Sequence, residues 1–156
     1  MKKIAVFASA LILSGCSAVK SAEKQKPVAE YFSVRAEVTD GDFSCEADMK
    51  RTSRGWEAVI DSPDTVKGTV FVIDGEQVHI SSGELGYSVP REDFPDSSPI
   101  RLTAAALDKC VAKHTEGEIC GQHYAVNVSD GVPKQLVIGS TVKVKFSKFK
   151  ENKAEE

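Results

Sequence analysis

Regular alternation of apolar and polar residues constrains the fold of this chain more than any other feature. Every second residue from Phe32 to Val38 is apolar, and Asp40-Gly41 then provides a turn. The same alternation runs from Phe43 to Met49, so the two segments predict an antiparallel hairpin. Similar runs recur to the end of the chain and predict about eight or nine strands in all.

A single helix interrupts these strands. Ser98 suits the capping position before it, and Pro99 suits the first helical position. An apolar stripe at helical spacing follows, formed by Ile100, Ala104, Leu107 and Val111. A meander of strands must hide one apolar face, and this helix is a natural lid for it. The predicted fold class is therefore α+β and mainly β: a strongly curved antiparallel half-barrel with one helical lid.

The N-terminus carries an export signal. Met1-Lys2-Lys3 is basic, residues 4–13 are apolar, and Leu13-Ser14-Gly15-Cys16 matches the bacterial lipobox. This segment resembles the signal peptide of a bacterial lipoprotein. The resemblance implies cleavage before Cys16, a covalent diacylglycerol on its thiol and an added N-acyl (palmitate-type) chain.

That signal sets the expected domain boundaries and location. We expect a signal peptide at 1–15 that is removed, a lipidated flexible tether at 16–29, a single domain at 30–149 and a disordered charged tail at 150–156. The acyl chains would hold the protein on a cell membrane, facing the extracytoplasmic or periplasmic side.

Charge and motifs argue against several classes of function. The chain has 20 Lys and Arg against 23 Asp and Glu, and it loses Lys2 and Lys3 with the signal. An acidic exported chain has no long-range attraction for nucleic acid, so no nucleic-acid partner is expected. No nucleophile motif, phosphate loop or paired-carboxylate signature is present. We therefore expect no catalytic residue, no enzyme activity and no cofactor beyond the covalent lipid.

Three cysteines remain once Cys16 carries lipid. Export permits disulfides, and Cys110 with Cys120 is the favoured pair because the two are close in sequence, which leaves Cys45 over. A zinc site is the alternative for Cys110 and Cys120, together with His114 and His123. Cys120 and His123 are three residues apart on a predicted strand and would face opposite ways, so no metal is expected.

Several short segments resemble a known family of domains. The order of turns and strands is similar to LolA/LppX-type lipoprotein-sorting and lipid-carrier domains over roughly residues 30–149. The segments that carry the resemblance are Gly55-Trp56, Ser62-Pro63, Val66-Lys67-Gly68, Asp74-Gly75-Glu76-Gln77-Val78, Gly131-Val132-Pro133-Lys134-Gln135-Leu136 and Val144-Lys145-Phe146. The resemblance implies an unclosed half-barrel whose apolar cavity binds acyl chains of lipids or lipoproteins. This chain is shorter than typical members, and no lid-latching arginine is transferred to it.

Two functional hypotheses remain open. In the first, the membrane-anchored lipoprotein binds or carries acyl chains in its half-barrel cavity. The candidate cavity-lining residues are Phe43, Met49, Trp56, Ile60, Val70, Val72, Val78 and Tyr124. In the second, the same positions form a filled core. The domain is then a surface structural or adaptor lipoprotein that binds a protein partner.

Overall fold

The computed structural model describes residues 26–154, so the predicted signal peptide and Cys16 lie outside the described residues. The described part contains one ten-stranded antiparallel sheet and one helix. The elements in chain order are β1 (Phe32–Asp40), β2 (Phe43–Thr52), β3 (Gly55–Ser62), β4 (Val70–Ile73), β5 (Gln77–Ser82), β6 (Leu85–Pro90), α1 (Pro99–Val111), β7 (Glu116–Ile119), β8 (Gln122–Ser129), β9 (Val132–Ile138) and β10 (Val142–Glu151).

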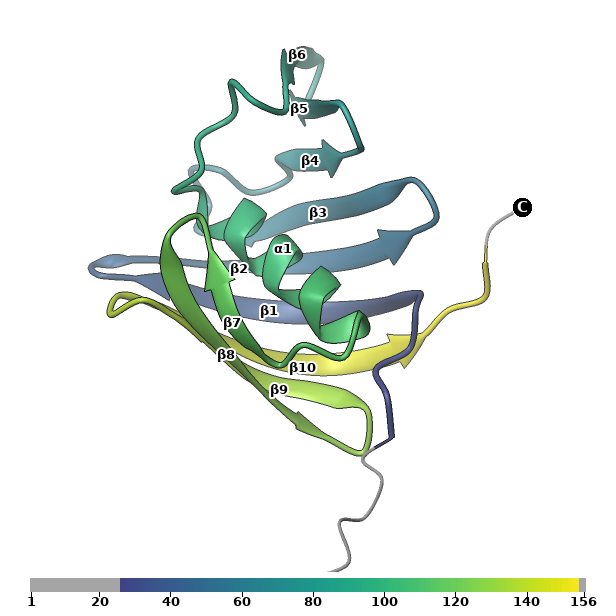
Figure 1. Cartoon of the computed structure of the whole chain (residues 1–156). Coiled ribbons are helices and arrows are strands. Elements are labelled where there is room, and N and C mark those ends of the chain that lie inside the picture. Colours follow the sequence, from purple (N-terminus) through teal and green to yellow (C-terminus); the bar gives the residue numbers. More distant parts are fainter. Residues whose placement is uncertain (1–25, 155–156) are drawn as a thin grey trace, which may run out of the picture.

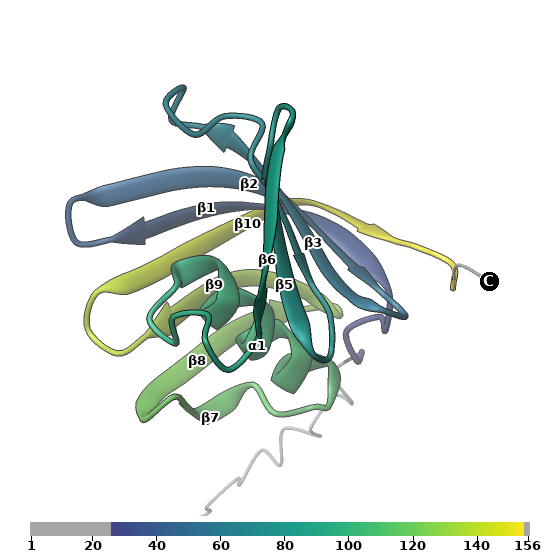
Figure 2. The ribbon, with the colours of Figure 1, turned by 90° about the horizontal axis from the view of Figure 1, so that it is seen from above.

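The sheet is a meander joined through its first and last strands. Its spatial order is β6-β5-β4-β3-β2-β1-β10-β9-β8-β7, so only the β1–β10 pair joins strands that are far apart in sequence. The sheet curves around α1 without closing, which leaves β6 and β7 as its two edges (Figures 1 and 2). The predicted fold class, a mainly β half-barrel with one helical lid, is confirmed.

The predicted number of strands was slightly low. The structure has ten strands among residues 26–154, and β7 is the strand that alternation did not predict. Its sequence, Glu116-Gly117-Glu118-Ile119, has only one apolar side chain, and hydrogen bonding to β8 makes it a strand. A short strand whose stability comes from its neighbour leaves little signal in its own residues.

The helix forms where the sequence predicts it. The Ser98 hydroxyl accepts a hydrogen bond from the backbone N–H of Arg101, and Pro99 occupies the first turn. Pro at this position loses no helical hydrogen bond, because the first N–H groups of a helix have no partner within it. Ile100, Ala104 and Leu107 are buried, and Val111 is half-buried at the end of the stripe.

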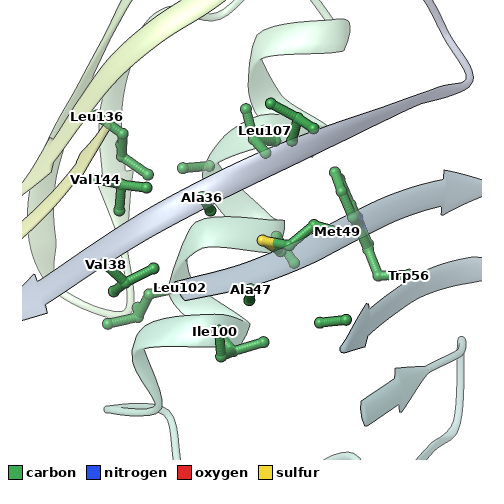
Figure 3. Close-up of a cluster of buried hydrophobic side chains, with 14 of the residues drawn as sticks. Ala36, Val38, Ala47, Met49, Trp56, Ile100, Leu102, Leu107, Leu136 and Val144 are labelled. Carbon is green, nitrogen blue, oxygen red and sulfur yellow. The ribbon is translucent and has the colours of Figure 1, made fainter. Parts of the chain in front are cut away.

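The core lies between α1 and the inner face of the sheet. Figure 3 shows Leu102 and Leu107 on the helix pointing toward side chains of the strands. Fourteen residues are drawn there, and those labelled from the strands are Ala36, Val38, Ala47, Met49, Trp56, Leu136 and Val144. The Phe32 and Trp56 rings meet edge to face, with centroids 5.6 Å apart. Burying side chains of this size stabilises the fold by about 1.5–3 kcal/mol each.

Both ends of the domain extend beyond the predicted boundaries. Val28 is buried, and the Nζ of Lys26 lies 2.9 Å from Oε1 of Glu151, so residues 26–29 pack on the domain rather than belonging to a free tether. At the other end, β10 continues to Glu151 because Lys150 pairs with Ser33 and Glu151 with Phe32. The predicted tail at 150–156 therefore begins inside a strand, because backbone pairing to β1 outweighs the polar composition there.

Within residues 26–154, α1 is neither long nor apolar enough to span a bilayer.

Candidate functional site

The inner face beneath α1 is filled by the protein's own side chains. Met49, Trp56 and Tyr124 are 1%, 4% and 1% exposed, and all three belong to one continuous cluster with the helix. Ile60 and Val78 are buried in the same cluster. A side chain this buried contacts protein on all sides, so these five predicted cavity residues are core residues. The cavity predicted beneath the lid is therefore already occupied.

The other three predicted cavity residues lie elsewhere. Val70 and Val72 pair with Val59 and Glu57 on the outer face, because the inner positions of β4 alternate with them. Phe43 begins β2 beside the β1–β2 turn, where its side chain is 48% exposed. The prediction was wrong for Val70 and Val72 because periodicity gives two faces but does not say which one is inward.

A short polar contact holds the helix against the sheet. Oδ1 of Asp108 on α1 accepts hydrogen bonds from Nε of Arg51, at 2.7 Å, and from Nε1 of Trp56, at 3.0 Å. Arg51 and Trp56 lie opposite each other on β2 and β3, so one carboxylate joins both strands to the lid. These hydrogen bonds satisfy the indole N–H at the rim of the core.

The helix does not cover the whole inner face. β4, β5 and β6 extend beyond its first turn (Figure 1). Ile73 and Val78 are buried beside Trp56, but exposure rises along the same face to 62% at Tyr87 and 80% at Leu85. We call this uncovered area the apolar shelf, and it consists of Phe71, Ile80, Leu85 and Tyr87. The loop after β6 covers the shelf only on the side nearest α1, where the centroids of the Phe94 and Phe71 rings lie 6.3 Å apart.

The shelf borders an open edge of the sheet. β6 pairs only with β5, so the backbone groups on its other side have no strand partner within the described sheet. β6 contains no charged residue. The opposite edge, β7, is only four residues long and carries exposed Glu116 and Glu118, features that discourage pairing with another strand. Only β6 therefore combines open backbone groups with exposed apolar side chains.

The predicted disulfide is absent. Cys45, Cys110 and Cys120 are free thiols in the structure. Cys110 is buried in the last turn of α1, whereas Cys120 lies in the β7–β8 turn close enough to Asp96 and Arg101 to interact with both. Arg101 lies nine residues before Cys110 on α1, a helical distance of about 13 Å, which is well beyond the reach of a disulfide. The prediction was wrong because β7 runs back along α1 and carries Cys120 from the last turn of the helix toward the first.

Burial determines the chemistry of these thiols. Desolvation raises the pKa of Cys110 to about 11 and also raises the pKa of Cys45. Within the described residues no group of three or more His, Cys, Asp or Glu side chains is arranged to hold a metal ion. Of the four residues weighed for zinc, His114, Cys120 and His123 are exposed while Cys110 is buried.

The outer face carries a network of charged side chains centred on Arg35. Its guanidinium donates to Glu46 at 2.7 Å, to Asp48 at 3.4 Å and also to Asp61. These partners raise the pKa of Arg35, while Arg35 and then Lys67 lower the pKa of Asp61. Three carboxylates face Arg35 and Lys67 here, so the network keeps an excess of negative charge. It links β1, β2 and β3 on the outer face through partly exposed ion pairs.

Sequence reasoning did not include Leu85 or Tyr87 among the candidate site residues. Both lie on a short run with apolar residues at alternate positions and no charge, Leu85-Gly86-Tyr87-Ser88-Val89. That pattern gave the only available signal, but it does not show that the run is an edge strand or that the helix ends before reaching it.

Comparisons with known proteins add little. No family model and no curated protein matches the chain. Among solved structures, the crystal structure of LolA superfamily protein NE2245 from Nitrosomonas europaea matches 84% of this chain and 90% of its own, with 8% sequence identity and a TM-score of 0.47. The fold class stated above rests on the strand order and the helix, and not on this likeness.

Proposed function

We propose that this protein is a membrane-anchored extracytoplasmic binding module that docks an extended segment of a partner protein on β6. The observation that carries the proposal is the contrast between the two parts of the inner face. The part under α1 is filled, with Met49 and Tyr124 each 1% exposed, whereas Leu85 and Tyr87 on the shelf are 80% and 62% exposed.

The chemistry of β6 favours a polypeptide as the occupant. An extended segment added beside β6 would satisfy backbone N–H and C=O groups that β5 does not reach. Its alternate side chains would lie over Leu85 and Tyr87, and exposed aromatic and aliphatic residues are typical anchors of protein interfaces. The absence of charge on β6 implies an apolar or aromatic segment.

Membrane anchorage supports the proposal without depending on the fold. The lipobox at Leu13 to Cys16 predicts a lipid-bearing N-terminus, and nine residues separate Cys16 from the first described residue, Lys26. The ten Cα-to-Cα steps between these two residues reach about 33 Å when fully extended, so the domain stays near the membrane surface. A tethered adaptor concentrates its partner there.

Acyl-chain binding is the second candidate, and a specific observation favours it. The inner positions of β4–β6 carry no charged residue, and the half-buried Phe71 and Ile80 continue the shelf toward the core. The resemblance to lipid-carrier domains points the same way. An acyl chain would then lie on the shelf, because the space beneath α1 is filled.

Site-specific photo-crosslinking in the intact cell distinguishes these ligands. The photoreactive residue p-benzoylphenylalanine replaces Tyr87 in one strain and the exposed Glu118 on the opposite edge, β7, in a control strain. We expect one discrete protein adduct from position 87, the same partner in every preparation, and none from position 118. Adding Leu85→Lys should remove the adduct, because a charge on the shelf opposes apolar docking.

The other outcomes decide against the proposal. An adduct with the mass of a second copy of this chain would make β6 a self-association edge. An adduct with the mass of a lipid would favour the second candidate. Equal labelling from positions 87 and 118, or none from either, would contradict a docking site on β6.

A further inference from the structure

We infer that the hollow between α1 and the β2–β3 and β4–β5 turns is a binding site for a phosphate group. The hollow has a volume of about 220 Å³. It is smaller than the 300–1,000 Å³ typical of sites for whole drug-sized ligands, so it suits a small anion or one headgroup. Its wall combines arginines from three separate segments with the apolar side chains of Ile73 and Trp56.

The charge of the hollow is opposite in sign to that of the chain. Arg51, Arg54, Arg91 and Arg101 line it with only two carboxylates, those of Asp74 and Asp108, although the whole chain has a net charge of −3. A cleft lined by one sign of charge focuses the local potential and attracts ions of the opposite sign.

Both carboxylates of the hollow are already engaged. Asp108 accepts from Arg51 and Trp56. Oδ1 of Asp74 accepts the backbone N–H groups of Glu76, at 2.8 Å, and Gln77, at 2.7 Å. These backbone hydrogen bonds lower the pKa of Asp74, and they hold the β4–β5 turn together. Neither aspartate forms an ion pair with Arg54 or Arg91, although the charge of Asp74 still reduces the positive charge of the hollow.

Among the described residues, two of the four arginines therefore have no ion-pair partner. Arg101 pairs with Asp96 at 2.9 Å, outside the hollow, and Arg51 pairs with Asp108. Arg54 and Arg91 form no ion pair with any of residues 26–154, and Nη1 of Arg91 donates to the backbone oxygen of Asp74 at 3.3 Å. Two guanidinium groups without a carboxylate partner complement the charge and oxygen geometry of a phosphate, which arginine binds in a bidentate manner.

The adjoining hollow shows that this charge excess is local. It shares Gly75, Arg91 and Arg101 with the first hollow but adds Glu76 and Glu92, so its carboxylates equal its arginines in number. The excess of arginines over carboxylates is thus confined to the side facing Arg54.

The phosphate could belong to a lipid headgroup or to a free phosphorylated molecule. The hollow lies at the end of the sheet where Phe32 pairs with Arg51, and the N-terminal segment reaches the domain at this same end. The expected anchor would therefore hold the hollow toward the membrane. The test separates the two sources.

The binding experiment uses the full chain carrying Cys16→Ser, so that no acyl chain is attached. One arm titrates inorganic phosphate, followed by NMR or calorimetry, and a second measures sedimentation with vesicles of phosphatidylglycerol against vesicles of phosphatidylcholine. The double variant Arg54→Gln/Arg91→Gln removes the free charge. The control Lys134→Gln/Lys143→Gln removes the same charge from exposed positions on β9 and β10.

We expect saturable phosphate binding that weakens at least tenfold in the arginine variant and less than twofold in the lysine variant. Phosphatidylglycerol binding with the same dependence identifies a headgroup, and phosphate binding without vesicle binding identifies a free ligand. No saturable binding in either arm, or equal losses in both double variants, would overturn the site. Unchanged circular dichroism and thermal midpoint in the variants exclude misfolding as the cause.

Discussion

At the scale of single residues, burial separates the three free cysteines more clearly than sequence does. Cys110 and Cys45 are 2% and 4% exposed, whereas Cys120 lies in an exposed turn. The reactive form of cysteine is the thiolate, so a thiol that is buried and has a raised pKa reacts slowly. The rate at which a reagent modifies each cysteine should therefore depend on where the fold places that cysteine.

This difference predicts the order of alkylation. Iodoacetamide at pH 8 should modify Cys120 in the folded protein at least tenfold faster than Cys45 or Cys110, as followed by peptide mass spectrometry. In urea the three rates should converge. Protection of Cys120 and Cys110 together, lost on reduction, would instead show a disulfide between them.

The ion pairs of Arg35 predict a dependence of stability on pH. Hydrogen bonds from Arg35 and then Lys67 hold the pKa of Asp61 below its ordinary value of 3.8. A carboxylate with a lowered pKa in the folded state stabilises the fold above the unfolded pKa, and this contribution is lost as pH falls through the folded pKa. The free energy of unfolding should therefore fall below about pH 4.

The variant Arg35→Gln isolates this contribution. Urea unfolding at pH 7 and pH 3 should show a smaller acid-induced loss of stability in the variant than in the parent chain. The exposed variant Lys134→Gln serves as the control and should lose as much as the parent. An acid response unchanged by Arg35→Gln would rule out the network as its source.

At the scale of elements, α1 closes the core of the half-barrel. It buries Leu102, Ala106 and Leu107 against the sheet at 0–1% exposure. Leu107→Ala should lower the free energy of unfolding by about 2–5 kcal/mol, because a cavity is left where neighbours cannot fully collapse. Denaturant titration measures this loss. Lys109→Ala, on the exposed side of the same helix, should change stability by less than about 0.5 kcal/mol.

Sequence patterns predicted the positions of the strands and the helix better than they predicted which side of each element is buried. Alternation and the Ser98-Pro99 cap located most strands and the helix, because these signals depend on local backbone geometry. Alternation could not say whether Val72 or Ile73 faces inward, since β4 is apolar on both sides. Nor could it show that the helix stops short of Leu85, because coverage depends on how the sheet curves.

The candidate sites were the least predictable part. The hollow with Arg54 and Arg91 combines two turns and a loop, segments that carry no periodic signal. The sequence does not show that Arg51 and Arg101 have ion-pair partners in the fold while Arg54 and Arg91 have none among the described residues.

At the scale of the whole molecule, the first described residues and the shelf lie toward opposite ends of α1. Val28 packs near Cys110 in the last turn, whereas Phe94, which contacts the shelf, precedes the first turn. A 13-residue helix is about 20 Å long, so an anchored domain would present β6 away from its attachment point. This orientation favours a protein partner over the lipid bilayer as the occupant of the shelf.

The central claim is that the inner face under α1 is filled, and the single tryptophan of the chain reports on it directly. Trp56 lies in that core at 4% exposure. A companion variant, Trp56→Phe/Tyr87→Trp, moves the reporter to the shelf. Titration with a dibrominated fatty acid, which quenches tryptophan on contact, should leave the fluorescence of Trp56 in the parent protein unchanged. Saturable quenching of Trp56 would place an acyl chain beneath the helix and contradict the account.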